Sequence, residues 1–256
     1  MQNIREVGEL CWLDLKTADM ACTKSFYNKL FGWGYHDEKW PHKTYPIIKQ
    51  QQSTLGGLTN MNDTPLPEGT PSHLSVYFAT HSIDSITANC RRGGGQILVE
   101  PFYLEDLMHL SVIQDPDGAI FSLLKTGTFQ AMNVLKQNEG VPSYIELTTP
   151  NLNKSMVFYT QIFGWTFKPF EYDFTQAVHI QIGHRIIGVM TSSKSGSSEW
   201  NVYYTVNSIE DTAQRAQNLG AQSHSNLREI PHIGKVCIFS DPVGITFGLI
   251  EYSRLS

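Results

Sequence analysis

The sequence predicts an α+β protein made of two similar domains in tandem, because landmarks of the first half return in the second. Residues 26–33 (FYNKLFGW) return as residues 158–165 (FYTQIFGW), at an offset of 132 residues. The turn sequence Asp-Pro-x-Gly at residues 115–118 returns at residues 241–244, at an offset of 126 residues. This ordered recurrence indicates the duplication of a unit of about 120 residues, which is an ordinary domain size.

Length and composition fit two globular domains. The 256 residues are 41% apolar and 17% charged, which suffices for two cores. We expect a first domain at residues 5–128, a linker at 129–140 and a second domain at 141–254. The net charge of −5, without a run of Lys or Arg, argues against binding to nucleic acid or to an anionic membrane surface. The cysteine spacing and the absence of a signal sequence predict reduced thiols in the cytoplasm.

Each repeat is expected to open with a strand and a helix. Residues 10–15 (LCWLDL) and 144–149 (YIELTT) are short runs with alternating character, which is typical of strands. Asp19 and Asn151 follow as N-cap candidates, before apolar residues at three-and-four spacing. Gly32 and its counterpart in the second repeat predict the ends of these helices.

A second strand and helix are expected in each repeat, after further strand-like segments such as residues 178–182. In the first repeat, a strand at 74–79 precedes a helix at 83–92, which ends in three glycines. In the second repeat, a strand at 200–206 precedes a helix that begins with a capping-box pattern at residues 208–211.

Each repeat is expected to close with two strands joined by the Asp-Pro-x-Gly turn. These strands are predicted at residues 110–113 and 119–125 in the first repeat, and at 235–239 and 245–250 in the second. Each half of the chain therefore consists of a strand, a helix and further strands, twice over.

This arrangement resembles the vicinal oxygen chelate superfamily, which comprises glyoxalases, bleomycin-resistance proteins and extradiol dioxygenases. The resemblance covers nearly the whole chain. It rests on the first strand, Asp19, the aromatic block at 26–33, the glycine-rich stop near Gly94 and the turn at 115–118, each with its repeat. It implies that each domain consists of paired βαβββ modules curling round a cleft. It does not specify a reaction, because one fold hosts many functions.

The resemblance implies a divalent metal held by side chains on the inward faces of the central strands. Transferred one position at a time, these ligand positions fall in this sequence at Trp12, Ser75, Ser122, Tyr144, Asn201 and Gly248. None of them is a strong ligand, whereas Zn²⁺, Ni²⁺, Mn²⁺ and Fe²⁺ sites need several His, Cys or carboxylate donors. We therefore predict no metal and no cofactor at these positions. A one-residue shift that brings in His73, partnered by Glu251, is the alternative.

The inward faces still predict a small-molecule site, because they combine aromatic rings with a few polar groups. The candidate ligand-binding residues on these faces are Trp12, Asp14, Ser75, Tyr77, Ser122, Tyr144, Glu146, Asn201 and Tyr203.

Asp14 and Glu146 occupy equivalent positions, 132 residues apart. Each carboxylate could hydrogen-bond a ligand or act as a general base. The alternative is that a neighbouring Lys, Arg or Tyr holds it in a purely structural role. His109 and Lys235 are also equivalent, and both are expected to be exposed at the surface.

Two functions remain open. The first is a metal-independent protein that holds a small molecule in one or both domains. The second is a lyase, an isomerase or a dioxygenase-type enzyme with a non-standard metal or carboxylate-base site, so catalytic residues are not assigned. The expected partner is a small molecule, with no nucleic acid or membrane, and the chain is expected to be a monomer with internal pseudo-dimer symmetry or a homodimer.

Overall fold

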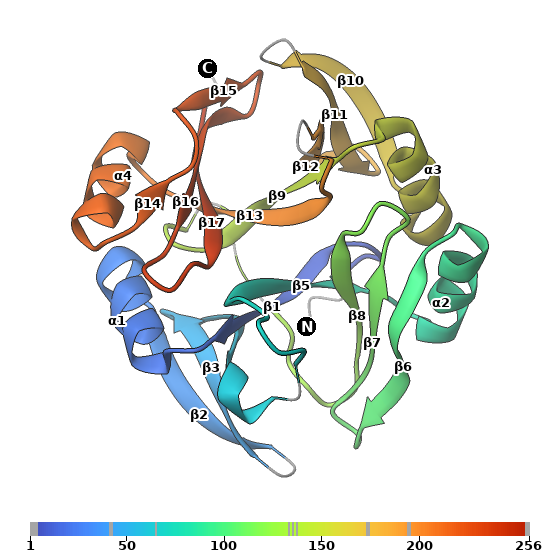
Figure 1. Ribbon diagram of the computed structural model, residues 1–256, viewed down its shortest axis with the longest axis horizontal. Helices are drawn as coiled ribbons and strands as arrows, with labels where there is room; N and C mark the ends of the chain where they lie inside the picture. Colours follow the sequence, from blue (N-terminus) through green and yellow to red (C-terminus); the bar gives the residue numbers. More distant parts are fainter. Residues whose placement is uncertain are drawn as a thin grey trace. The chain divides into compact units, whose positions relative to one another are not determined.

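The structure is a computed structural model that describes residues 5–40, 43–64, 66–132, 134, 136, 138–172, 175–193 and 196–253. These residues form four successive βαβββ modules, two in each repeat (Figure 1). The first module contains β1 (Leu10–Thr17), α1 (Met20–Phe31), β2 (Gly34–Trp40), β3 (Lys43–Gln50) and β4 (Ser53–Asn60), followed by the short 3-10 helix η1 (Met61–Asp63). The second module contains β5 (His73–Ala79), α2 (Ile83–Arg92), β6 (Gln96–Leu104), β7 (Met108–Gln114) and β8 (Ile120–Thr126).

The second repeat has the same order of elements, except that two short strands, β14 and β15, stand in the place of β6. The third module contains β9 (Pro142–Thr149), α3 (Leu152–Phe163), β10 (Thr166–Tyr172), β11 (Thr175–Ile182) and β12 (Arg185–Ser192). The fourth module contains β13 (Glu199–Thr205), α4 (Ile209–Asn218), β14 (Gln222–Ser223), β15 (Arg228–Ile230), β16 (Gly234–Ser240) and β17 (Thr246–Tyr252). The predicted α+β class with tandem repeats is confirmed.

The helix ends match the sequence prediction. Asp19 caps α1 by accepting a hydrogen bond from the backbone N–H of Cys22, and Asn151 caps α3 through Lys154. Gly32 and its repeat counterpart end these helices in the left-handed conformation, at φ values of 73° and 71°. Glycine is favoured in this conformation because glycine has no Cβ that would clash with the backbone.

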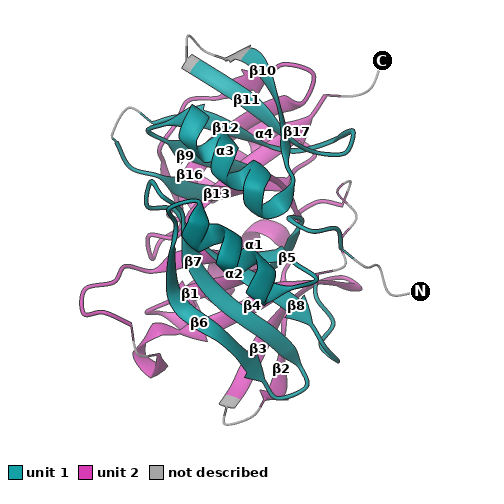
Figure 2. Ribbon diagram, turned by 90° about the vertical axis from the view of Figure 1, so that its right-hand side faces the viewer, with its two compact units in different colours: residues 1–12, 76–131, 145–200 teal, residues 13–75, 132–144, 201–256 magenta. Residues whose placement is uncertain are grey.

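The chain divides into two compact units, which are coloured separately in Figure 2. Unit 1 comprises residues 1–12, 76–131 and 145–200, and unit 2 comprises residues 13–75, 132–144 and 201–256. Each unit therefore combines one module of the first repeat with one module of the second. The boundaries 5–128 and 141–254 describe the repeat along the sequence and stay a prediction.

Each unit contains two short mixed arrays of strands. In unit 1 the strand orders are β6-β7-β8-β5 and β10-β11-β12-β9. In unit 2 they are β2-β3-β4-β1 and β13-β17-β16, and β16 also pairs with β14 and β15. The first strand of each module pairs in parallel with the last strand of the same module, and the hairpins between them are antiparallel.

The repeated aromatic block forms the core of each unit. In unit 1 the rings of Phe163 and Trp165 lie 5.4 and 5.5 Å from that of Phe78. In unit 2 the rings of Phe26 and Tyr27 lie 5.7 and 5.9 Å from that of Phe247. Each block thus packs against rings of the other repeat. Such ring pairs contribute about 0.5–1.5 kcal/mol each beyond the area that they bury.

Candidate functional site

The structure separates the two faces of the first strand in each repeat. On β1, the hydroxyl of Thr17 lies 2.8 Å from that of Thr23 on α1, so this face of the strand is covered by the helix. On β9, Thr149 makes the same contact with Ser155 on α3, also at 2.8 Å. Because side chains alternate along a strand, the even-numbered positions from 12 to 16 and from 144 to 148 lie on the opposite face.

Asp14 lies on this opposite face, within a group of four polar side chains on three neighbouring strands. We call Asp14, Lys16, Tyr45 and Thr59 the Asp14 cluster. Lys16 Nζ lies 2.5 Å from Asp14 Oδ2, and the hydroxyls of Tyr45 and Thr59 donate to Oδ1 at 3.0 and 2.9 Å. Gly57, opposite Asp14 on β4, leaves room for the Tyr45 ring, because a Cβ there would lie 1.9 Å from the Tyr45 hydroxyl oxygen.

The surroundings of Asp14 favour its charged form. Burial would raise its pKa, but the Lys16 ammonium and the hydroxyls of Thr59 and Tyr45 outweigh burial, so the pKa is lowered. A carboxylate held ionised in this way is a weak proton acceptor at neutral pH, which opposes a role as general base. The sequence leaves open a ligand-binding or general-base role and a purely structural role for Asp14. Its contacts with a Lys and a Tyr match the structural role.

Glu146 occupies the equivalent place in the third module. It is buried, and the hydroxyl of Thr191 donates to its Oε1 at 3.0 Å. Thr191 follows Thr59 by 132 residues, so the carboxylate–threonine contact is repeated. On the same face, the rings of Phe170 and His179 are stacked, with centroids 4.0 Å apart.

The other predicted ligand-binding residues lie on the central strands as expected, and several are in contact. Trp12 packs edge-on against Phe129 of the predicted linker, with ring centroids 4.7 Å apart. Tyr77 and Ser122 are paired in register on β5 and β8. In unit 2, the rings of Tyr144 and Tyr203 lie 6.1 Å apart. Asn201 is buried on β13, and Ser75 is half-buried on β5.

The side chains at the equivalent positions 109 and 235 differ in their exposure. His109 is only 6% exposed and its ring stacks on that of Tyr103, at 3.9 Å, so the expectation that it lies on the surface is wrong. The sequence carried no signal of Tyr103 as its partner, because β6 was not predicted. The Lys235 side chain is 44% exposed, and it pairs with Glu210 at 2.8 Å.

The residues at the six transferred metal positions do not fit a divalent transition metal. They offer two serine hydroxyls, one amide, one tyrosine phenol, one indole and one glycine in place of His or carboxylate donors. At Gly248, a side chain of any kind is blocked, because a Cβ would lie 2.3 Å from Cδ1 of Tyr203. Among the described residues, no group of three or more His, Cys, Asp or Glu is placed to hold a metal ion.

The shifted alternative with His73 and Glu251 has no support from their contacts. His73 Nδ1 lies 2.9 Å from the carbonyl oxygen of Pro71, in an exposed position. The Glu251 carboxylate accepts the backbone N–H of Ile209 at 2.9 Å, at the N-terminus of α4. Both side chains therefore have ordinary structural roles.

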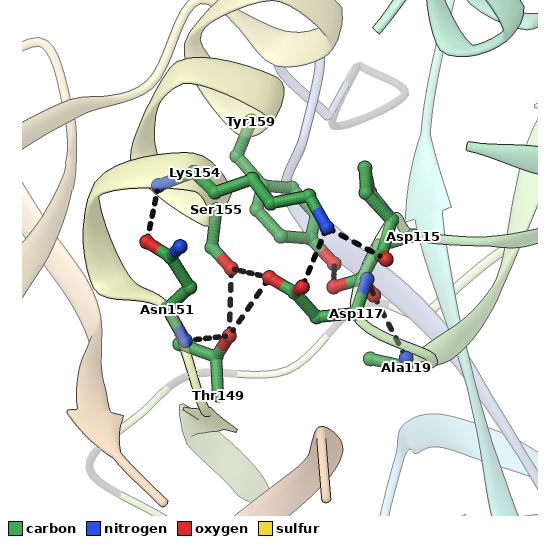
Figure 3. Close-up of polar contacts among 9 residues, drawn as sticks. Asp115, Asp117, Ala119, Thr149, Asn151, Lys154, Ser155 and Tyr159 are labelled. Atoms are coloured by element: carbon green, nitrogen blue, oxygen red, sulfur yellow. Dashed lines mark hydrogen bonds and ion pairs between the residues drawn. The ribbon is translucent and has the colours of Figure 1, made fainter. Parts of the chain in front are cut away.

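The repeated Asp-Pro-x-Gly turn also has a structural role (Figure 3). Asp115 accepts two backbone N–H groups of its own turn and the hydroxyl of Tyr159, at 3.0 Å. Asp117 pairs with Lys154 Nζ at 2.7 Å. The turn of one repeat thus holds α3 of the other. Burial is the main cause that raises the pKa of Asp115, as it does for its counterpart Asp241.

The partners of the two carboxylates were missed by the sequence reasoning, although some signals existed. Lys16 lies two residues from Asp14, hence on the same face of one strand. Thr59 and Thr191 recur at the offset of the repeat. Tyr45 is not repeated, because Ala177 stands at the equivalent position of the second repeat.

Relatives of the chain carry several names. "Putative glyoxylase CFP32" of Mycobacterium tuberculosis is 28% identical over 249 residues, which cover 94% of this chain and 93% of that protein. "Anthracycline biosynthesis protein DnrV" of Streptomyces peucetius is 25% identical over 264 residues, covering 95% and 93%.

Solved structures show the same fold at low identity. A Mn(II)-bound glyoxalase from Novosphingobium aromaticivorans matches with a TM-score of 0.66 at 18% identity, covering 96% of this chain and 82% of that one. The 2,2',3-trihydroxybiphenyl 1,2-dioxygenase of Sphingomonas wittichii matches with a TM-score of 0.63 at 12% identity, covering 98% and 92%.

The family model of the Glyoxalase/Bleomycin resistance protein/Dioxygenase superfamily matches twice, at residues 10–123 and 142–249. These two segments agree with the repeat in the sequence and with the four βαβββ modules of the structure. The chain therefore belongs to the Glyoxalase/Bleomycin resistance protein/Dioxygenase superfamily, as a member with two tandem copies of the family domain.

Proposed function

We propose that the protein binds a small molecule without a metal ion, on the strand faces opposite the helices. The observation that carries this proposal is the chemistry of the six transferred ligand positions, which hold Trp12, Ser75, Ser122, Tyr144, Asn201 and Gly248. Aromatic rings and neutral polar groups at these places suit stacking and hydrogen bonding to an organic ligand. They do not suit the coordination of a transition metal.

The faces around these positions support the same proposal. Trp12 with Phe129, and Phe170 with His179, present rings on the faces that carry Asp14 and Glu146. Two relatives have names from anthracycline biosynthesis, and anthracyclines contain fused aromatic rings. An aromatic small molecule is therefore the ligand class that we propose. The four cysteines are free thiols, in agreement with a reducing compartment such as the cytoplasm.

Native mass spectrometry and elemental analysis of the freshly purified protein test the proposal together. We expect a co-purifying organic molecule, or saturable binding of an aromatic compound, with less than about 0.1 Zn, Ni, Mn or Fe per chain. About one such metal ion per chain, lost when a His or Glu is replaced, would contradict metal independence.

Turnover separates the binding protein from the enzyme. Adducts of 2-oxoaldehydes with thiols and catechols are the substrates to assay, each with and without added Mn²⁺ or Fe²⁺. Turnover that depends on Glu146 would establish the carboxylate-base alternative. Tight binding without turnover supports the proposal.

A further inference from the structure

The second module has a strand face that is apolar, uncharged and partly open to solvent. The strand registers align its side chains in rows across β6, β7, β8 and β5. One row is Val99, Val112, Ser122 and Tyr77, and the next is Phe102, Leu110, Leu124 and Ala79. The rings of Phe78 and Phe121 pack on the other side of the sheet, 5.8 Å apart. We call the two rows, with Ile120 at one end, the Val112 face.

None of the residues of the Val112 face carries a charge, and several are well exposed. Val99 and Phe102 are 41% exposed and Ile120 is 53% exposed. Leu110, Val112 and Tyr77 are half-buried. Glu100 lies on the edge strand β6 between the two rows, and its carboxylate forms an ion pair with Arg91 at 2.6 Å. An exposed apolar face of this kind on a soluble chain marks a binding surface.

The equivalent face of the fourth module is more closed by its own side chains, although Ile238, the counterpart of Val112, is half-buried as Val112 is. Tyr203, the counterpart of Tyr77, is fully buried, with its ring over Gly248, the counterpart of Ser122. Val236, the counterpart of Leu110, is also fully buried. In the second repeat the Tyr203 ring therefore covers part of the sheet face, whereas the equivalent face of the first repeat is more exposed.

We infer that the first repeat takes the ligand on the Val112 face, that the second repeat is a structural copy, and that the ligand is neutral and hydrophobic. This inference rests on the proposed function and narrows it to one face. The charge pattern argues for a neutral ligand. In a chain of net charge −5, an anion would meet no cation on this face, and a cation would meet no carboxylate. The hydroxyls of Ser122 and Tyr77 provide the polar contacts that orient one oxygen or nitrogen of the ligand.

Two related dyes test the ligand class. N-phenylnaphthylamine is neutral, and its sulfonate ANS has the same rings with one negative charge; both fluoresce on entering an apolar site. We expect the full-length protein to bind phenylnaphthylamine at least about tenfold more tightly than ANS, because the sulfonate would be desolvated without a partner. Equal binding of both dyes would overturn the claim of a neutral ligand.

A matched pair of variants tests the location. Val112→Asp places a charge in the centre of the face, and Ile238→Asp places it at the equivalent, also half-buried, position of the second repeat. We expect Val112→Asp to weaken phenylnaphthylamine binding about tenfold or more, and Ile238→Asp to leave it within about twofold. If Val112→Asp fails to fold, Phe102→Ala replaces it. Its ring is 41% exposed, so the fold should persist while affinity falls about threefold to fivefold.

Three other outcomes would overturn the inference. Loss of binding only in Ile238→Asp would overturn the inference by moving the site to the second repeat, while the proposed function stands. If the wild type, freed of any co-purifying ligand, binds no dye, the inference alone would be overturned. A dimer that Val112→Asp converts to a monomer, measured by sedimentation, would show that a second copy covers the face and would also overturn it.

Discussion

Replacing Asp14 by Asn should destabilise the protein while leaving ligand affinity nearly unchanged. Asp14 is 4% exposed and accepts hydrogen bonds from Lys16, Tyr45 and Thr59. Asn retains one acceptor for the hydroxyls but loses the ion pair. Breaking a buried pair costs about 3–5 kcal/mol, and we expect about 2–4 kcal/mol here because water can reach Lys16, whose side chain is 16% exposed. For a chain of this size, the melting temperature should fall by roughly 5–15 °C.

The stability difference between the wild type and Asp14→Asn should depend on pH. The pKa of Asp14 is lowered in the folded state, so its contribution to stability is present above the ordinary pKa of 3.8 and is lost as the pH falls through the lower, folded value. The difference between wild type and Asp14→Asn should be largest near neutral pH and should narrow below about pH 4. Urea unfolding at several pH values measures it.

A double-mutant cycle with Lys16→Met isolates the ion pair from other effects of each change. We expect the double variant to be more stable than the sum of the single effects predicts, by about 1–3 kcal/mol. Additive effects, or a loss of stability in Asp14→Asn that is equally large at pH 3 and pH 7, would refute this account of Asp14. A tenfold loss of dye affinity in Asp14→Asn would instead give it a role at the ligand.

Replacement of Asp241, Phe158 or Gly248 should also change the stability of the protein. Burial raises the pKa of Asp241 from 3.8 to about 6, so its contribution to folding stability falls as the pH rises through that window, by up to about 3 kcal/mol. Asp241→Asn should lack this fall, and parallel melting curves for the two proteins from pH 4 to 7 would contradict it. Phe158 is 1% exposed, so Phe158→Ala should cost about 3–5 kcal/mol in urea unfolding; a cost below 1 kcal/mol would show that the core of unit 1 lies elsewhere. Gly248→Ala should cost about 1–3 kcal/mol, because its Cβ overlaps the Tyr203 ring. Adding Tyr203→Ala should relieve that overlap, and a Gly248→Ala variant as stable as wild type would refute it.

The parts of the fold that were predicted correctly depend on local chemistry. Asp19 and Gly32 set the ends of α1 through contacts within a few residues, so their sequence signals are direct. The hairpins of the first module were not placed, because β2 and β3 lack clear alternation and β3 contains Pro46. Pairing between β3 and β4 depends on contacts that no short window of sequence records.

The candidate site was predictable in position but not in contacts. Alternation along β1 and β9 correctly placed Asp14 and Glu146 on the face away from the helices. Their partners Tyr45 and Thr59 lie 31 and 45 residues from Asp14 in sequence, beyond the reach of strand periodicity. The choice between a ligand role and a structural role depended on those partners, so it required the structure.

The two repeats agree at helix ends and turns and differ on the strand faces away from the helices. Helix caps and turns stabilise the module itself, and the loss of an N-cap would destabilise either copy by about 0.5–2 kcal/mol. The difference between Ser122 and its counterpart Gly248 affects the strand face instead. Only at Gly248 is there room for the Tyr203 ring to lie against the sheet. Tyr203, which lies over glycine, is fully buried, whereas Tyr77, which is paired with serine, is half-buried. One methylene and one hydroxyl therefore separate the more buried copy from the more exposed one, and for this reason we propose the first repeat as the one that takes the ligand.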